Sequence, residues 1–157
     1  MGETARILIV DDDENIRKVL ETILADEGYI VESAETAKKG IEKSEKAFYN
    51  LALIDVRLPD MEGIELLSKL RNTKPKMRKI IVTGYPTLQN AIAAVNKGAD
   101  AYVMKPFDVE RILQTIKEQL HKQEEEKSFS EEKVVEFIET RIKALETIDQ
   151  QAVKKDA

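Results

Sequence analysis

The feature that most constrains the fold is a set of short apolar runs that do not alternate with polar residues. Four such runs occupy residues 7–10, 51–54, 80–82 and 101–104. A strand with one solvated face alternates apolar and polar residues, so unbroken runs are typical of parallel strands that are buried on both faces. A fifth run at 29–31 has more polar surroundings, and we expect it at an edge of the sheet.

Helical periodicity fills the segments between these runs. Apolar residues recur at helical spacing in 16–24, 64–70, 88–95 and 109–120, and more weakly in 36–47. Gly28 and Gly98 are expected to stop two of these helices, and Asp108 to cap the last one. Alternating strands and helices imply a parallel sheet with right-handed crossovers. We therefore predict an α/β fold, a doubly wound five-stranded parallel sheet with helices on both faces.

Composition removes several classes of protein. Apolar residues make up 42% of the 157 residues and charged residues 35%, which is typical of a globular domain. With no cysteine and one histidine, thiol catalysis and sites built from several imidazoles are excluded. The net charge of −5 argues against direct binding of nucleic acid. No apolar run approaches the roughly 20 residues of a membrane span and no signal peptide is evident, so we expect a cytoplasmic protein without membrane contact.

The chain divides into a domain at 5–121 and a charged tail at 122–157 with helical character. Residues 121–130 are strongly charged and are expected to form a linker or a solvated extension of the helix. Residues 131–149 carry an amphipathic pattern for which Ser130 is a fair N-cap. Because a lone helix of this length is marginal in water, we expect its apolar stripe to pair two chains as a homodimer. We expect no long coiled coil, since the stripe is short and Arg141 intrudes on it.

Polar residues follow the strands at the points where ligands bind in doubly wound sheets. The residues are Asp11, Asp12 and Asp13 after the first run, Asp55 after 51–54, Thr83 after 80–82 and Lys105 after 101–104. Crowded carboxylates tolerate ionisation when a cation lies among them, and oxygen ligands without histidine or cysteine favour Mg²⁺. Lys105 would pair with Asp55 or a phosphoryl group, whereas Asp13 is better explained as a helix cap.

Five stretches carry a resemblance to a known family. They are ILIVDD at 7–12, LIDVRLPDMEG at 53–63, IVTGY at 81–85, GADAY at 98–102 and KPF at 105–107. Residues 5–121 resemble the receiver domain of two-component response regulators, of the chemotaxis-regulator-like kind. The resemblance implies the flavodoxin-like strand order 2-1-3-4-5. It also implies a phosphoprotein switch that is not an enzyme, beyond its own phosphotransfer and autodephosphorylation.

The resemblance assigns roles to the residues at the strand ends. Asp55 would be the phosphoacceptor, taking a phosphoryl group from the histidine of a partner histidine kinase. Asp11, Asp12, Asp55 and the backbone carbonyl of Arg57 would hold Mg²⁺, with Asp12 the more direct ligand. Lys105 would clamp the phosphoryl group, and a cis peptide is expected between this residue and Pro106.

The resemblance also implies a switch that carries the signal to a partner. Thr83 and Tyr102 would be the switch pair, with Thr83 moving toward the phosphoryl group and Tyr102 turning inward. The surface expected to change comprises the helix at 87–97, the fifth strand and the fifth helix. A downstream protein or an output domain would read this surface.

Other functions are less well supported by the residues. A phosphatase with an aspartyl nucleophile needs an acid two residues beyond that nucleophile, and Arg57 occupies this position. A flavin module would need a phosphate loop after the first strand, where Asp11, Asp12 and Asp13 would repel phosphate. No GxxxxGK[ST] loop is present. The sequence leaves open whether the chain is a single-domain regulator or the receiver part of a larger regulator or hybrid kinase.

Overall fold

The apolar runs form strands and the segments between them form helices in a computed structural model that describes residues 4–156. The strands are β1 (Arg6–Val10), β2 (Ile30–Ala34), β3 (Leu51–Asp55), β4 (Arg78–Thr83) and β5 (Ala101–Met104). The helices are α1 (Glu14–Asp26), α2 (Ala37–Lys46), α3 (Gly63–Leu66), α4 (Leu88–Asn96) and α5 (Val109–Asp156). Each strand and helix predicted from the sequence is therefore present.

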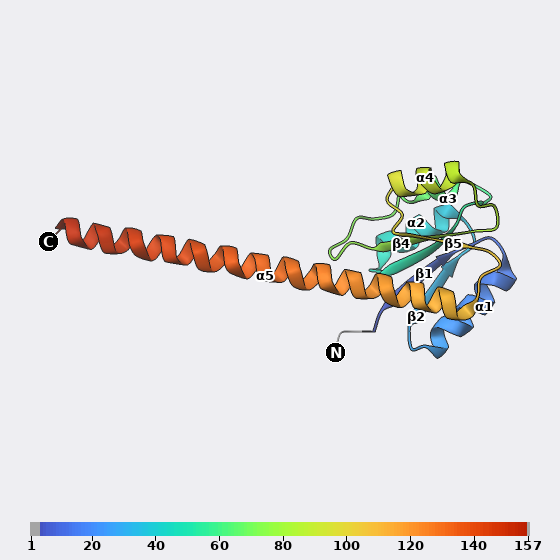
Figure 1. Cartoon of the computed structure of the whole chain (residues 1–157), viewed down its shortest axis with the longest axis horizontal. Helices are drawn as coiled ribbons and strands as arrows, with labels where there is room; N and C mark the ends of the chain where they lie inside the picture. Colours follow the sequence, from blue (N-terminus) through green and yellow to red (C-terminus); the bar gives the residue numbers. More distant parts are fainter. Residues whose placement is uncertain (1–3, 157) are drawn as a thin grey trace. The chain divides into compact units, whose positions relative to one another are not determined.

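The strands form one parallel sheet in the order β2-β1-β3-β4-β5, as expected (Figure 1). β2 lies at an edge, as its polar surroundings predicted. β5 occupies the other edge, yet Val103 belongs to the apolar cluster on one face and Tyr102 packs against the cluster on the other. Within this strand Val103 is buried while Met104 is 54% exposed. The prediction of two-sided burial therefore holds for the body of this strand and fails at Met104, its last residue.

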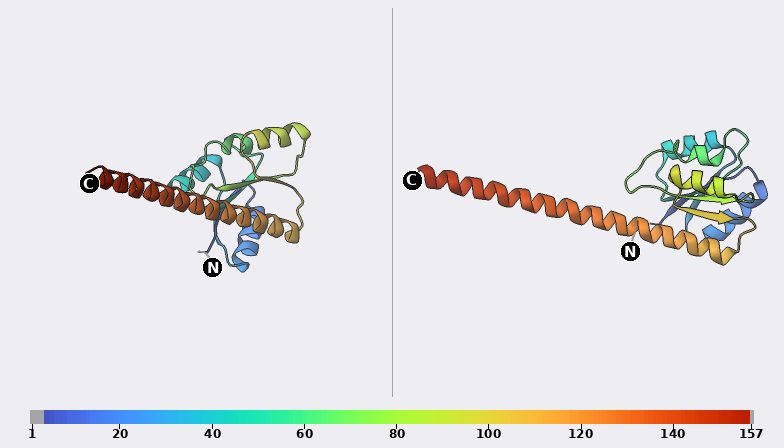
Figure 2. Two further views of the ribbon diagram at one scale, coloured as in Figure 1. Left: turned by 60° about the vertical axis from the view of Figure 1, so that its left-hand side comes forward. Right: turned by 45° about the horizontal axis from the view of Figure 1, so that its top comes forward.

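Helices cover both faces of the sheet, with one apolar cluster on each side (Figure 2). On one face, the strands pack against Leu20 and Leu24 of α1 and Ile112 and Ile116 of α5. On the other face they pack against α2, α3 and α4. The weakly predicted helix at 36–47 is α2, and its buried Ala37 contributes to this second cluster.

Local residues set the ends of several helices. Gly28 and Gly98 have φ values of 95° and 102°, and each lies directly beyond the last turn of its helix, α1 or α4. Glycine adopts this left-handed conformation without strain, which explains the two predicted stops. The side chain of Asp13 accepts hydrogen bonds from the backbone N–H groups of Asn15 and Ile16, so it caps α1 as expected. Asp108 likewise accepts from the N–H of Glu110 at the start of α5.

Helix α3 is shorter than the predicted segment 64–70. It ends at Leu66, and the chain continues to Leu70 in turns. The carbonyl of Leu67 accepts a hydrogen bond from the buried ammonium of Lys79 at 2.6 Å, and the N–H of Arg71 donates to the side chain of Ser44. A continuing helix would join these two groups to each other. The helix has already ended before these contacts, because the N–H of Lys69 donates to the carbonyl of Leu66, three residues back, at 2.9 Å. The long-range contacts then hold the turns that follow, and the apolar residues of the segment face the core as predicted.

Helix α5 spans the boundary between two compact units, the first ending at Gln123 and the second beginning at Glu124. In the first unit, the buried amide of Gln123 donates to the carbonyls of Asn50 and Lys76 at 2.9 and 2.8 Å. In the second unit, Ser130 lies inside the helix, so the prediction that it caps a separate helix was wrong. Residues 109–156 contain neither glycine nor proline and are rich in strong helix formers.

No helix within residues 4–156 is both long enough and apolar enough to cross a membrane.

Gly63 packs directly against the backbone that carries Asp55. Its N–H donates to the carbonyl of Val56 at 2.7 Å, and a Cβ built on Gly63 would lie 1.9 Å from the carbonyl oxygen of Asp55. Nothing larger than glycine fits there unless the backbone moves.

We predict that Gly63→Ala lowers the free energy of unfolding by about 2–3 kcal/mol, because the added methyl group overlaps main-chain atoms. Gly84→Ala is the matched control, since its Cβ would meet only the Cβ of Lys105, at an ordinary 3.9 Å. Urea denaturation of both variants measures the difference. Equal stability of the two variants would contradict the packing described here.

Candidate functional site

Three carboxylates meet where the strand order reverses, between β1 and β3. Asp11 and Asp12 follow β1, and Asp55 is the last residue of β3. Each offers one oxygen, and these three oxygens lie within 4.8 Å of one another. Asp11 is buried, Asp55 is partly buried and Asp12 is exposed. The fold therefore brings together the three side chains predicted to bind Mg²⁺, in an arrangement that suits a hard divalent cation.

Lys105 links the two less exposed carboxylates. Its ammonium lies 2.9 Å from Oδ2 of Asp11 and 3.3 Å from Oδ2 of Asp55. The peptide bond between Lys105 and Pro106 is cis, as expected. Asp11 is held further by the N–H of Asp13, which donates to its Oδ1 at 2.9 Å. Arg17, to which the sequence pointed in no way, donates from its guanidinium to the backbone carbonyl of Asp11 at 2.8 Å.

The environment perturbs both members of the Lys105–Asp55 pair. Burial raises the pKa of Asp55, and the nearby charge of Asp11 raises it further, against the opposing effect of Lys105. Burial alone would lower the pKa of Lys105, but the hydrogen bond and charge of Asp11, together with Asp55, outweigh it and raise this pKa. The site therefore favours the charged ammonium of Lys105, whereas the ionised carboxylate of Asp55 is disfavoured by burial and by repulsion from Asp11.

The loop after β3 fixes the position of Asp55. The N–H of Arg57 donates to Oδ1 of Asp55 at 3.3 Å, and Arg57 forms an isolated bridge with Glu62. Asp60 accepts hydrogen bonds from the N–H groups of Ala37 and Lys38, each at 2.9 Å, and so ties this loop to the start of α2. Asp60 lies within the stretch that carried the family resemblance, yet its role as a long-range cap was missed.

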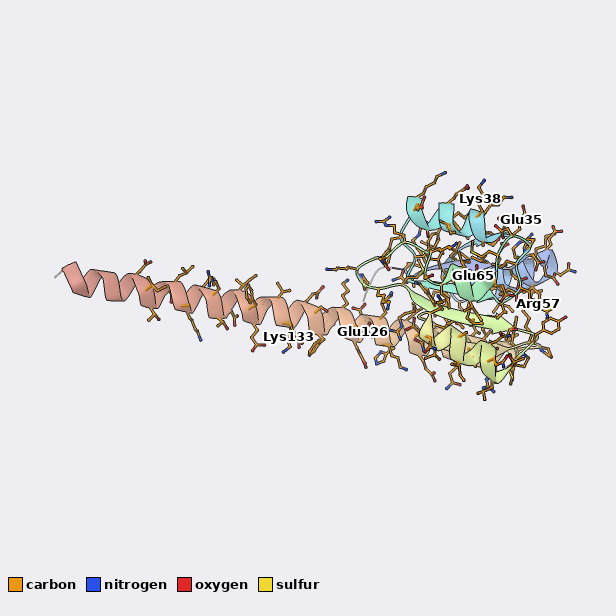
Figure 3. The ribbon with its side chains drawn as sticks, turned by 90° about the horizontal axis from the view of Figure 1, so that it is seen from above. Glu35, Lys38, Arg57, Glu65, Glu126 and Lys133 are labelled. Carbon is orange, nitrogen blue, oxygen red and sulfur yellow. The ribbon has the colours of Figure 1, made fainter. Side chains whose placement is uncertain are left out.

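An aromatic contact lies beside the acidic cluster. The guanidinium carbon of Arg57 is 3.8 Å from the centroid of the Tyr85 ring, so these side chains stack although they follow different strands. Arg57 lies at the surface of the first unit (Figure 3). The position of its backbone carbonyl as a metal ligand stays a prediction.

The predicted switch residues lie on β4 and β5. Thr83 ends β4 and is buried, and its hydroxyl oxygen accepts a hydrogen bond from the N–H of Tyr85 at 3.0 Å. Tyr102 pairs in register with Ile81, and its hydroxyl is buried without a hydrogen-bond partner. The ion pairs of the acidic cluster join Asp11, Asp55 and Lys105. Thr83 and Tyr102 take no part in these ion pairs and lie on β4 and β5.

The parallel sheet in the order 2-1-3-4-5 and the acidic cluster that follows its strands are together those of a receiver-type signalling domain. The chain belongs to the response regulator receiver domain family, whose model matches residues 7–117. This finding confirms the resemblance carried by the five sequence stretches. The family binds Mg²⁺ at an acidic site, and Asp11, Asp12 and Asp55 form a cluster of carboxylates that could hold a metal ion.

Several known proteins are similar to the chain. The crystal structure of a CheY-like response regulator receiver domain protein from Methanospirillum hungatei JF-1 matches with a TM-score of 0.76 and 52% identity, over 79% of this chain and 99% of that one. The uncharacterized transcriptional regulatory protein YkoG of Bacillus subtilis (strain 168) is 36% identical over 115 residues, which are 73% of this chain and 50% of that protein. The transcriptional regulatory protein ZraR of Klebsiella oxytoca is 34% identical over 76% of this chain and 27% of its own length. The chain thus spans half or less of these two curated relatives.

The raised pKa of Asp55 predicts a specific pH dependence of stability. The folded protein favours protonated Asp55, so the contribution of this residue to stability falls as pH rises from its ordinary pKa of 3.8 through the raised value. Asp55→Asn removes the charge and should therefore be more stable than the wild type at pH 7 but not at pH 3. Denaturation at pH 3 and at pH 7, in the presence of a chelator, measures the stability of the wild type and of Asp55→Asn.

Asp60→Asn provides the control of opposite sign. Backbone hydrogen bonds from Lys38 and Ala37 lower the pKa of Asp60, so its ionised form stabilises the fold, and the loss caused by its replacement should grow as pH rises. If the two variants respond to pH in the same direction, the electrostatic description of Asp55 is wrong.

Proposed function

We propose that the chain is a switch that accepts a phosphoryl group on Asp55 from the phosphohistidine of a partner histidine kinase. The observation that carries the proposal is the cluster itself, a partly buried carboxylate with two acidic neighbours and one ammonium at the carboxyl ends of the strands. A carboxylate is a competent nucleophile when its environment positions it and neutralises the charge that approaches.

The proposed transfer conserves atoms and charge. An oxygen of Asp55 attacks phosphorus, the P–N bond to the kinase histidine breaks, and its electron pair stays on the imidazole nitrogen. An acyl phosphate forms on Asp55. The ammonium of Lys105, already 3.3 Å from Asp55, is placed to pair with a phosphoryl oxygen.

Asp11, Asp12 and Asp55, with the backbone carbonyl of Arg57, are the groups that we propose to hold Mg²⁺. When bound, Mg²⁺ would supply positive charge that offsets the phosphoryl oxygens and the crowded carboxylates. Asp11 is tied into the fold by a hydrogen bond from Asp13 and an ion pair with Lys105. Asp12 is exposed, and its carboxylate has no such contact among the described residues. This difference supports the assignment of Asp12 as the more direct ligand.

Thr83 and Tyr102 are the proposed switch pair. A phosphoryl group adds roughly −1.5 to −2 charges and three acceptor oxygens beside β4. The Thr83 hydroxyl can donate its proton to one of them, since its oxygen currently serves only as an acceptor. The unpartnered hydroxyl of Tyr102 marks a second group whose hydrogen bonding can change when its surroundings do.

The proposed output surface is the face formed by α4, β5 and the first part of α5. It carries four large apolar side chains that are at least half exposed: Leu88, Ile92, Val95 and Met104. Exposed apolar groups of this density are typical of a surface that binds a partner protein. The partner would be a downstream protein or an output domain of a larger regulator. YkoG is an example of such a larger regulator, because the matched part covers 50% of its length.

We still expect that this chain does not bind nucleic acid directly. Two of the relatives are named transcriptional regulatory proteins, but the matched part covers half of one and 27% of the other. The net charge of −5 remains the argument against a phosphate-binding surface here.

Phosphorylation gives the first test. Incubation with acetyl phosphate and Mg²⁺ should add one phosphoryl group per chain by intact mass, and Asp55→Asn or a chelator should abolish the addition. Asp13→Asn is the control, because asparagine still caps α1, and its labelling should match the wild type. Full labelling of Asp55→Asn, or labelling indifferent to the chelator, would overturn the assignment.

Switching is tested by the hydroxyl of Thr83. In the wild type, phosphorylation should shift the backbone NMR signals of residues 84–104. Thr83→Ala should still accept the phosphoryl group but lose most of these shifts, whereas Thr83→Ser keeps the hydroxyl and should retain them. Unchanged shifts in Thr83→Ala would show that this residue does not couple Asp55 to the output surface.

A further inference from the structure

The second unit presents an apolar stripe that nothing within the unit covers. Along its helix, eight large apolar residues remain 49–71% exposed: Phe129, Val134, Val135, Phe137, Ile138, Ile142, Leu145 and Ile148. Figure 3 shows side chains along both margins of this helix, with Glu126 and Lys133 labelled. A helix that buries none of its own apolar surface gains little stability in water, so its stripe has a partner to find.

The spacing of the stripe defines one favourable seam. Val135, Ile138, Ile142 and Leu145 follow one another at intervals of three, four and three residues, the a and d positions of a heptad repeat. The adjacent choice, through Val134, Ile138 and Leu145, would place Arg141 in the centre of the seam. In the favoured register Arg141 lies at the flank of the seam and does not interrupt it.

The residues in the seam favour two chains. Val135 and Ile142 are β-branched at a, and Leu145 is at d, a combination typical of two-stranded coiled coils. Ile138 at the other d position is the one departure from that pattern. The seam is two heptads long, which suits a weak, reversible contact.

The charged flanks select the relative direction of the two helices. Glu139 and Glu146 occupy e positions and Arg141 a g position. In a parallel pair, each g residue faces the e residue five positions further along the other helix, so Arg141 meets Glu146 of the second copy. In an antiparallel pair, e faces e and g faces g, which opposes glutamate to glutamate and arginine to arginine. Opposite charges therefore favour the parallel arrangement.

We propose that residues 131–149 of two copies of the chain form a short, parallel, in-register coiled coil, with Val135, Ile138, Ile142 and Leu145 in its seam. The proposal does not depend on phosphorylation of Asp55. It names the partner of the second unit as a second copy of the same segment, and it fixes which residues face themselves across the two-fold axis.

Cysteine cross-linking tests register and direction together, because the chain has no native cysteine. Val135→Cys and Leu145→Cys lie about 15 Å apart along the helix. In a parallel, in-register pair each faces its own copy within reach of a disulfide. Under mild oxidation of the full chain, both should yield covalent dimers. Thr140→Cys, an f position on the opposite side of the helix, is the control and should stay monomeric.

Each alternative gives a different pattern. An antiparallel pair can bring at most one of the two seam positions against itself, so a single cross-linked variant would overturn the proposal. Absence of cross-linking in both, with helical circular dichroism retained, would mean that the stripe docks elsewhere. Equal cross-linking of all three variants would indicate random collision, and it would equally overturn the seam.

Charge reversal provides an independent test of direction. Arg141→Glu should weaken dimerisation about tenfold, since two attractive pairs become repulsive. Glu146→Arg should weaken it similarly, and the double variant should restore the wild-type affinity. An antiparallel pair predicts a different pattern. Arg141→Glu would change little, because both copies change and one like-charge contact replaces another, whereas Glu146→Arg would strengthen dimerisation by placing arginine against glutamate. Sedimentation equilibrium up to about 100 μM measures the affinity and the mass, and a trimer or a monomer throughout would overturn the proposal.

Discussion

The repulsion between Asp11 and Asp55 is the constraint around which the first unit is arranged. Two carboxylates that are withdrawn from solvent and lie in one cluster are unfavourable together, and the structure answers with the ammonium of Lys105 between them. The strand order supplies this geometry, because β3 pairs with β1 while β5 lies two strands away. The lysine must therefore extend from beyond β5 to reach both acids.

Much of the fold could be predicted because the relevant signals are local. Unbroken apolar runs identified the strands, and the positive-φ glycines Gly28 and Gly98 marked two helix ends. What could not be predicted depends on contacts between residues far apart in sequence. The ammonium of Lys79 binds the carbonyl of Leu67 and holds the turns that follow α3, and no pattern within 64–70 predicts that contact. Ser130 failed for the converse reason: a good capping residue does not start a helix where the preceding residues are already helical.

The candidate site shows the same division. The acidic residues and Lys105 were predictable as a group, since parallel strands deliver their carboxyl ends to one edge. The supports around them were not. Arg17 holds the carbonyl of Asp11, and Asp60 holds the start of α2, through side chains whose partners lie on other segments. The stacking of Arg57 on Tyr85 likewise joins residues from two loops that only the folded sheet brings together.

The contact between Gly63 and Asp55 restricts the direction in which the main chain of Asp55 can move. With the backbone of Gly63 packed against the carbonyl of Asp55, the main chain of this residue has no room to move toward Gly63. The loop behind it is anchored twice, through Val56 and through Asp60. We therefore expect a modification of the Asp55 side chain to displace the ends of β4 and β5, on the other side of β3, rather than this loop. We expect the side of Asp55 that faces Gly63 to stay fixed and the side that faces β4 and β5 to move.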